Sequence, residues 1–497
     1  MKMKTRGADF ISRHREAVAF LALYVVLFGA WNLSGGSFKV WQDLWQLLPW
    51  PSLLDDLGRS LLDLHAQPPF LNLVFGAALK ASVLMGTTVE TLLQPLYFVL
   101  GAFTVVSLTA VAIAIIPRSG VRRVVLLLVL SNPYFYAVHH VLFYTAWECF
   151  FLSLTALLSL RYFEHRSAAR LVTALAPAVL LVYTRSLFHP LWFVLLLAMM
   201  LTLGRPIPPG SWKRFSVVCA VALLLIAAWP LKNLTRFGFF GLSSWSGFSI
   251  SRGLLAGDLL LNSGYPLLVA FCRDRSSSVD PLDAAVAQSL VPSEFRGHPT
   301  LSELTKPDGS PNWNHYAIIP LSSRLGNAAL ERVRREPSLL FFKAVDFYLN
   351  GYAIYEARWP YERGFSPDMT TGSAWASLYE LVVFQRFRPY DPGRTGVTTG
   401  FAVLFPIILV TTGIVLCRRR PWGAAERTIV VMLFTILWVL AMVVFVDGAE
   451  GNRIRFSTEP YLFLVIGWLV GNRPAKGAQA PPAPEEDRLQ FRTKGAA

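Results

Sequence analysis

The stretch TLLQPLYFVLGAFTVVSLTAVAIAIIPRSGVRRVVLLLVLSNPYFYAV, residues 91–138, decides the fold. It contains two long apolar runs separated by a turn with three arginines, Arg118, Arg122 and Arg123. Each run is close to the ~20 residues that an α-helix needs to cross ~30 Å of hydrocarbon. Short connections rich in Lys and Arg between such helices stay in the cytoplasm. The stretch therefore predicts two membrane helices joined by a cytoplasmic turn.

The rest of the chain repeats this pattern. Of its 497 residues, 54% are hydrophobic and 15% are charged, whereas soluble proteins are about 25% charged. This composition excludes a soluble enzyme, a disordered protein and a disulfide scaffold. The net charge of +15 lies mostly in short loops between apolar runs, which indicates membrane orientation and not nucleic-acid binding. The apolar runs are 17–35, 68–85, 91–117, 121–138, 141–163, 169–184, 187–203, 215–231, 397–416, 428–446 and 459–471.

Counting every apolar run as a crossing conflicts with the positive-inside rule. If run 68–85 crossed, the arginines that follow run 91–117 would lie outside. Run 68–85 is short, begins with Pro68-Pro69 and contains Lys80. We therefore predict that it forms a helix that lies at or dips into the outer surface. Ten crossings then remain, with both termini and every basic cluster in the cytoplasm.

These observations predict an all-α polytopic membrane protein. It has about ten transmembrane helices, a non-spanning juxtamembrane helix and a helical outer domain. Its Ala, Arg and Gly richness favours the bacterial inner (plasma) membrane, with the outer domain in the periplasm. We divide the chain into four parts. Residues 1–231 form an N-terminal transmembrane catalytic module with a first outer loop, 36–90, and residues 232–396 form an outer domain. Residues 397–471 form the C-terminal transmembrane helices, and residues 472–497 form a disordered cytoplasmic tail.

The first outer loop holds the largest group of candidate catalytic side chains. In LLDDLGRSLLDL, residues 53–64, the leucines recur at helical spacing, which predicts an amphipathic interfacial helix. One aspartate that faces a cavity at the bilayer surface would act as a base; alternatively, the aspartates only solvate the polar face. We expect Asp63 to cap or solvate the turn into Pro68. The candidate residues of this loop are Asp43, Asp55, Asp56, His65 and Gln67.

A second polar group opens the apolar run 141–163. Glu148 lies within this run, so it must face protein or water, and an ionisable residue at such a position indicates function. His139, His140 and Tyr144 precede it. Adjacent histidines on a helix point about 100° apart, and no further metal ligand can be named. Interfacial hydrogen bonding is therefore the alternative to a substrate-binding role for the two histidines.

Arginines in short outer turns are disfavoured by the positive-inside rule, so those present need a reason. Arg185 lies in one such turn, and Arg453 and Arg455 lie in another. A planar guanidinium suits phosphate, so an anionic ligand is one reason. Contact with lipid headgroups is the alternative for Arg185, and an internal set of ion pairs is the alternative for the other two. The same segments and the start of the outer block add His189, Asn452 and Lys232 to the candidates.

Carboxylates on one side and arginines on the other describe a cavity suited to a lipid-phosphate-linked sugar. Four short motifs follow one another along the chain: His65-Ala66-Gln67-Pro68-Pro69, the turn Asn132-Pro133, Glu148 at the start of the next helix, and Asn452-Arg453-Ile454-Arg455-Phe456. Their order resembles that of the GT-C superfamily of membrane glycosyltransferases, which use polyprenyl-phosphate sugars. Protein O-mannosyltransferases and the bacterial aminoarabinose transferase of lipid A are members.

This resemblance implies an inverting hexosyl or pentosyl transferase in the membrane. Its donor would be a polyprenyl-phosphate-linked sugar and its acceptor a glycan, lipid or protein on the outer face. The resemblance also implies one essential first-loop aspartate without choosing it. We favour Asp55 or Asp56, which the His65–Pro69 segment follows shortly, with Asp43 and Glu148 as alternatives.

Two further points stay open at the level of the sequence. Some relatives use a divalent metal, so metal dependence is undecided, and no other cofactor is expected. A transporter or flippase of a lipid-linked or anionic substrate is the alternative function. Transporters often show paired halves, whereas no repeat is evident here and the polar residues gather on one side.

Overall fold

The computed structural model describes residues 2–34, 36–41, 44–206, 210–254, 281–352, 378–379, 400–447 and 451–472. Every regular element in these ranges is a helix, and two isolated bridges, Lys39 with Val141 and Thr305 with Pro311, are the only β pairings among them. The predicted all-α class is therefore confirmed for the described part of the chain.

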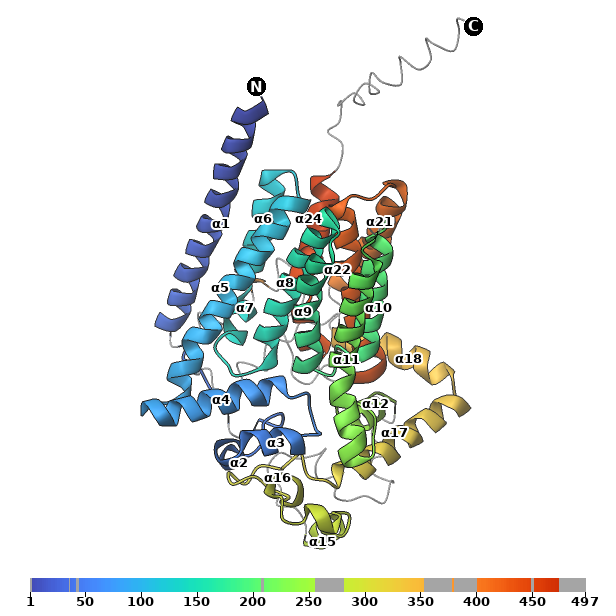
Figure 1. The fold of residues 1–497 in the computed structure, drawn as a ribbon. Coiled ribbons are helices and arrows are strands. Elements are labelled where there is room, and N and C mark those ends of the chain that lie inside the picture. Colours follow the sequence, from blue (N-terminus) through green and yellow to red (C-terminus); the bar gives the residue numbers. More distant parts are fainter. Residues whose placement is uncertain are drawn as a thin grey trace, which may run out of the picture.

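A bundle of helices forms the body of the molecule (Figure 1). Its members coincide with ten of the predicted apolar runs: α1 (Lys2–Leu33), α5 (Val89–Ile115), α6 (Ser119–Leu130), α8 (Tyr144–His165), α9 (Ala168–Thr184), α10 (Pro190–Leu203), α11 (Trp212–Phe237), α21 (Gly400–Arg418), α22 (Ala424–Met442) and α24 (Glu459–Gly471). By length and apolar composition, five described segments suffice to cross a membrane: Arg15–Leu33, Val89–Ile115, Trp212–Phe237, Gly400–Arg418 and Ala424–Phe445. The predicted count of about ten crossings is not confirmed.

Contacts gather basic turns at one end of the bundle. The Asn472 carbonyl accepts a hydrogen bond from Arg419 (2.6 Å), and the Asn472 side chain donates to the Ile115 carbonyl at the end of α5 (3.2 Å). Arg166, after α8, donates to the Arg205 carbonyl after α10 (3.3 Å). Figure 1 shows α1 beginning at this same end. The placement agrees with the predicted grouping of basic clusters on one side.

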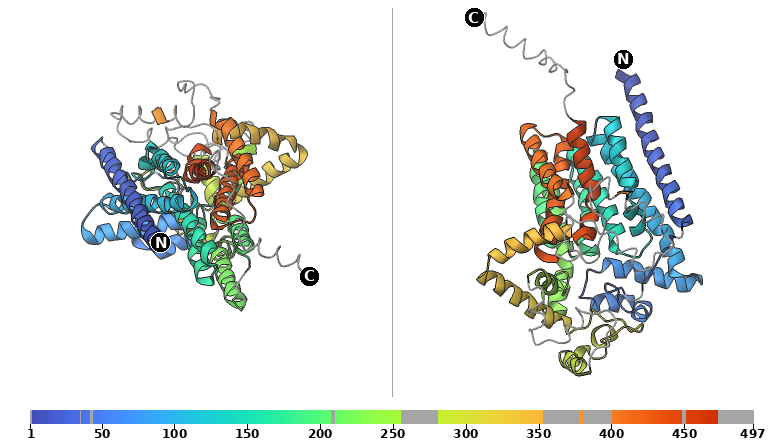
Figure 2. Two further views of the ribbon diagram at one scale, coloured as in Figure 1. Left: turned by 90° about the horizontal axis from the view of Figure 1, so that it is seen from above. Right: turned by 180° about the vertical axis from the view of Figure 1, so that it is seen from behind.

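Helix α4 (Phe70–Met85) lies across the opposite end of the bundle (Figures 1 and 2). It follows Pro68-Pro69 and ends at Gly86, whose φ of +61° is the left-handed conformation that glycine adopts without strain. One face is buried, including Phe75, while Leu84 on another face is 87% exposed. This orientation agrees with the predicted non-spanning helix, and its exposed apolar side is typical of a helix at a membrane surface.

A second layer of helices lies at the level of α4 and beyond it (Figure 1). In chain order its members are α2 (Trp50–Asp55), α3 (Leu57–Asp63), α12 (Ser246–Leu254), α15 (Pro281–Ser289), η1 (Ser293–Phe295), α16 (Pro299–Ser302) and α17 (Ile318–Arg335). Gly76 of α4 allows α3 to pack closely, because a Cβ there would lie 2.5 Å from a Leu57 methyl group. The described part of the predicted outer block is thus helical.

Helices α12 and α17 cross at very close range. A Cβ on Gly247 of α12 would lie 1.8 Å from the Ser322 carbonyl oxygen of α17, so only glycine fits. Phe248, Trp313 and Leu321 form a small apolar core beside this crossing. The remaining described elements are α7 (Pro133–Val138), α18 (Ser338–Phe347), η2 (Tyr348–Tyr352), η3 (Val443–Asp447) and α23 (Gly451–Phe456).

Candidate functional site

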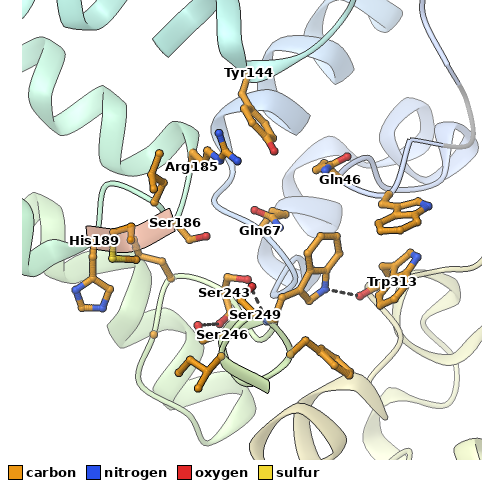
Figure 3. Close-up of a pocket in the computed structure, with 18 of the residues that line it drawn as sticks. Gln46, Gln67, Tyr144, Arg185, Ser186, His189, Ser243, Ser246, Ser249 and Trp313 are labelled. Carbon is orange, nitrogen blue, oxygen red and sulfur yellow. Dashed lines mark hydrogen bonds between the residues drawn. The ribbon is translucent and has the colours of Figure 1, made fainter. Parts of the chain in front are cut away.

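A cavity of about 560 Å³ lies between the bundle and the outer layer, at the end opposite the basic turns. Segments from six parts of the chain line it, from the first outer loop to the end of α22 (Figure 3). The lining is rich in aromatic rings and in neutral hydrogen-bonding groups. Its polar and aromatic side chains are Trp45, Gln46, Gln67, Tyr144, Arg185, Ser186, His189, Phe240, Ser243, Trp245, Ser246, Phe248, Ser249, Trp313 and Trp438.

Arg185 is the one arginine or lysine among the described residues that line this cavity. It follows the last residue of α9 and is 5% exposed. Its Nη1 donates to Glu148 Oε1 across 3.2 Å, and its guanidinium lies 4.4 Å from the centre of the Tyr144 ring. Glu148 is fully buried. The structure thus brings together three predicted site residues from the second and third polar segments.

The His65–Pro69 segment is held in place by the outer block. Asn314 Oδ1 accepts hydrogen bonds from the backbone N–H groups of His65 (2.9 Å) and Ala66 (3.0 Å). The His65 carbonyl accepts from the Ser244 N–H (2.9 Å), and Ser243 Oγ donates to the Ala66 carbonyl. These bonds fix the backbone so that the next residue, Gln67, faces the cavity (Figure 3).

His65 itself is a buried neutral side chain. Its Nδ1 is 2.8 Å from Ser244 Oγ, and its ring packs edge-on against Phe237. Burial, reinforced by the nearby Lys232 charge, lowers the pKa of His65 to about 3. His65 does not line the cavity. It contacts the neighbouring segment and leaves the cavity wall to Gln67.

Asp63 is buried, contrary to the expectation that it caps or solvates the turn into Pro68. It is 2% exposed and forms an ion pair with Arg236 of α11. Its Oδ2 is 2.9 Å from His298 Nδ1, and Arg59 Nη2 lies 2.9 Å from the other ring nitrogen of that histidine. The sequence interpretation was wrong because these partners come from distant outer segments that no local pattern reveals. Asp63 joins the first loop to the outer block.

Lys232 lies on the same face of α11 as Arg236, as their i,i+4 spacing requires. Its Nζ donates to the carbonyls of Leu62 (3.3 Å) and Leu64 (2.5 Å), and its charge lies 3.9 Å from the centre of the Trp229 ring. Lys232 therefore stabilises the end of α3, and it does not line the cavity.

The first-loop aspartates are placed unequally. Asp55 and Asp56 are exposed, neither lines the cavity, and Asp56 Oδ1 caps α3 by accepting from the Arg59 N–H (2.9 Å). Asp43 lies outside the described residues. Trp45 and Gln46, which follow it closely in the sequence, both line the cavity.

The two adjacent histidines lie away from the cavity, in a contact between the end of α7 and α1. Both are fully buried. Each Nδ1 bonds a backbone carbonyl of α7, His139 to Phe135 and His140 to Tyr136, and His140 Nε2 is 2.8 Å from Asn32 Oδ1. The hydrogen-bonding alternative that the sequence left open describes these contacts. In the described ranges no three or more His, Cys, Asp and Glu side chains gather to form a metal site.

The late arginine segment forms a second buried polar group. Arg455 Nε donates to Glu459 Oε1 (3.1 Å), and Asn132 Nδ2 donates to Glu459 Oε2 (3.2 Å). Arg455 and Glu459 are 1% and 2% exposed, and neither lines the cavity. This is the internal ion pair left open as an alternative for Arg455. The side chains of Asn452 and Arg453 lie outside the described residues.

Sequence reasoning missed the tryptophans of the cavity. Trp45, Trp245 and Trp313 come from three segments that share no motif, and each is unremarkable in a chain with 15 tryptophans. The available signal was their position on the outer side, within loops rich in Ser, Gly and Asn. His189 and Tyr144, by contrast, were predicted and do line the cavity.

No family model and no curated protein matches the chain. Comparison with solved structures finds similarity to the crystal structure of ArnT from Cupriavidus metallidurans bound to undecaprenyl phosphate. The sequences are 15% identical, the match covers 90% of this chain and 77% of that chain, and the TM-score is 0.34.

Proposed function

We propose that this chain is an integral-membrane glycosyltransferase of the GT-C type. It moves a sugar from a polyprenyl-phosphate donor to an acceptor on the outer face of the membrane. One observation carries the proposal: a cavity at the end of the apolar bundle combines a buried arginine with aromatic rings and neutral amide and hydroxyl groups. This combination suits a ligand with one anionic group and several hydroxyls. Undecaprenyl phosphate, bound to ArnT in its crystal structure, is the class of lipid that such a donor would contain.

Arg185 is the proposed partner of the donor phosphate. A guanidinium presents five N–H donors in a fixed plane, and the bond to Glu148 orients that plane at the cavity wall. Low exposure strengthens its interaction with a phosphate because little water screens the charge. Arg453 and Asn452 remain proposed contacts of the same phosphate from the late outer turn. We assign Arg455 to the internal pair with Glu459 and Lys232 to the end of α3.

The proposed reaction is one displacement at C1 of the sugar. A carboxylate takes the proton of the acceptor hydroxyl as its oxygen attacks C1. The bond from C1 to the phosphate oxygen breaks, the configuration inverts, and polyprenyl phosphate leaves with the bonding electrons. Arg185 stabilises the charge that grows on the leaving phosphate. We propose Asp43 as the base, because it is the first-loop aspartate nearest in sequence to Trp45 and Gln46 at the cavity wall.

Release of polyprenyl phosphate from synthetic donors tests the proposal. The purified protein in detergent is incubated with polyprenyl-phosphate-linked mannose, glucose and arabinose, together with a membrane and periplasmic extract as a source of acceptors. Arg185→Lys keeps the charge but loses the planar fork, so it should lower donor affinity at least tenfold. Arg170→Lys, at the exposed opposite end of α9, is the matched control and should behave as the unmodified protein.

Three aspartate variants identify the base. Asp43→Asn keeps the shape of the side chain and should slow transfer by about 10²–10⁴, while Asp55→Asn and Asp56→Asn should retain transfer. Loss of transfer in the Asp55 or Asp56 variant alone would reject the assignment of Asp43. If no donor releases polyprenyl phosphate and the protein in vesicles instead moves the intact lipid across the bilayer, the flippase alternative replaces the glycosyltransferase.

A further inference from the structure

Three tryptophans form one wall of the cavity. We call Trp45, Trp245 and Trp313 the tryptophan wall. The ring centres of Trp45 and Trp313 are 5.0 Å apart, and those of Trp245 and Trp313 are 5.5 Å apart. All three residues line the cavity, and Phe248 extends the apolar surface beside them. The rings of Trp45 and Trp313 are inclined by 30°, and the ring of Trp245 stands nearly edge-on to that of Trp313, at 64°. The wall is therefore an angled aromatic surface, and a ring-shaped ligand would pack on one indole face at a time.

The tryptophan wall is held rigidly by bonds between segments. Trp245 Nε1 donates to the Trp313 carbonyl (3.1 Å), which fixes the start of α12 against the loop before α17 (Figure 3). Lys306 Nζ donates to the carbonyl of Leu44 (2.7 Å), which ties the same loop to the residue before Trp45. A surface ordered before the ligand arrives costs less conformational entropy on binding.

The polar groups beside the wall are uncharged. Gln46, Gln67 and Ser249 supply amide and hydroxyl donors and acceptors. Ser243 and Ser246 already donate to the backbone carbonyls of Ala66 and Ser243, so their hydroxyl oxygens are left as acceptors. No carboxylate occurs among the described residues that line the cavity. Neutral hydroxyls are satisfied by such groups without burying a charge. The C–H face of a pyranose or furanose ring is apolar and packs on an aromatic face, while its hydroxyls lie around the edge. The wall and its neighbours therefore match a neutral sugar ring.

The position of the wall indicates whether it contacts the donor or the acceptor. Arg185, Tyr144, Trp438 and Met442 line the cavity from the bundle helices or the turns between them, where a lipid tail would lie. The tryptophan wall comes from the first outer loop and the outer block, and Figure 3 shows Trp313 on the opposite side of the cavity from Arg185 and His189. A donor held by its lipid and phosphate occupies the bundle side. The wall is left for the molecule that arrives from the aqueous side.

We infer that the tryptophan wall is an acceptor subsite, and that the acceptor is a glycan bound through a neutral sugar ring. The inference rests on the proposed function in one respect, which is that the bound glycan is called an acceptor. Binding of a glycan to the subsite can be tested without any donor. A single-chain lipid, or a peptide without aromatic or proline residues, would present no comparable ring to the wall.

Direct binding to a broad glycan array tests the subsite. The full-length protein in detergent, without donor, is applied to arrayed oligosaccharides and, on the same surface, to serine- and threonine-containing peptides and to lipids. We expect binding to a set of glycans that contain neutral residues. Trp45 is only partly buried, so Trp45→Leu should fold and weaken this binding at least tenfold, while Trp45→Phe should retain most of it. The matched control is Trp212→Leu. Trp212 is exposed and is the first residue of α11, at the end of that helix far from the outer block.

The outcomes separate this inference from the proposed function. Binding of peptides or lipids but no glycan, an empty array, or glycan binding that Trp45→Leu leaves unchanged would each overturn the subsite. In those cases, slow hydrolysis of the donor to polyprenyl phosphate by the same preparation would still support the proposed glycosyltransferase. Glycan binding that depends on Trp45, in a protein that cleaves no donor, would support the subsite and reject the proposed reaction. In a working transfer assay, Trp45→Leu should raise the KM for the bound glycan at least tenfold with the donor KM unchanged.

Discussion

Removing the charge of Glu148 alone should destabilise the protein strongly. Glu148 is fully buried and Arg185 is 5% exposed, so substitution to Gln leaves a buried guanidinium without its counter-charge. Coulomb's law at the observed 3.2 Å separation, with an effective dielectric constant of about 20, gives an attraction of about 5 kcal/mol. Breaking buried pairs typically costs about 3–5 kcal/mol. We therefore expect Glu148→Gln to lower the free energy of unfolding by about 3 kcal/mol.

A double-mutant cycle separates this electrostatic cost from lost packing. Arg185→Met removes the opposite charge and should also cost about 3 kcal/mol, because it leaves the Glu148 carboxylate buried without a cation. The double variant removes both charges, so it should be more stable than the sum of the two single losses predicts, by about 2 kcal/mol or more. Unfolding is followed by tryptophan fluorescence as SDS is added to dodecylmaltoside micelles.

Two results would refute this reasoning. If both single variants lose less than about 1 kcal/mol, water screens the pair as it screens exposed ion pairs. If the two losses simply add in the double variant, the side chains do not interact. Cys149→Ser, which alters the neighbouring buried residue without changing charge, controls for nonspecific damage to α8.

Three further perturbations test other parts of the structure. Asp63→Asn should lower the free energy of unfolding by about 2 kcal/mol, since Arg236 loses its counter-charge while remaining partly solvated. If the variant keeps its stability, or if its first outer loop resists protease as before, Asp63 does not hold that loop to the outer block. His65 stays neutral in the folded protein down to its pKa of about 3, whereas it protonates near its ordinary value of 6.5 when unfolded, so stability should fall as the pH drops from about 6.5 towards 3. His65→Asn should flatten that slope, and an identical pH profile would reject the assignment. A cysteine placed by Ser119→Cys should react with a membrane-impermeant maleimide only from the side that carries the basic turns; reaction from the other side would reject the predicted topology.

Much of the fold follows from local sequence patterns. Apolar runs of helical length, separated by basic turns, predicted the bundle and the end at which Arg166 and Arg419 lie. The conflict raised by Arg118, Arg122 and Arg123 predicted that run 68–85 does not cross, and α4 indeed lies across the bundle. These features depend on hydrophobicity and on charge within one segment, which the sequence displays directly.

The site was predicted less completely because its contacts join distant segments. Arg185 was chosen from a different segment than Glu148 and Tyr144, and it proves to contact both of them. Asp63 was misjudged because its partners, Arg236 and His298, are far from it in the sequence. A carboxylate on an amphipathic helix looks solvated unless the segment that covers it is known. The tryptophan wall was missed for the same reason.

The residues that line the cavity are far apart in the sequence, which has a consequence for biosynthesis. Trp45 and Gln46 stand near the beginning of the chain, whereas Trp438 and Met442 belong to the penultimate long helix. These positions are about 400 residues apart, which a ribosome covers in about 20–80 s at 5–20 residues per second. Throughout that interval the cavity is incomplete, and once Trp313 has been made it lacks only the side that α22 supplies. Ligand binding there is thus a property of the finished polypeptide, and a chain stalled before α22 would enter quality control with its aromatic surface uncovered.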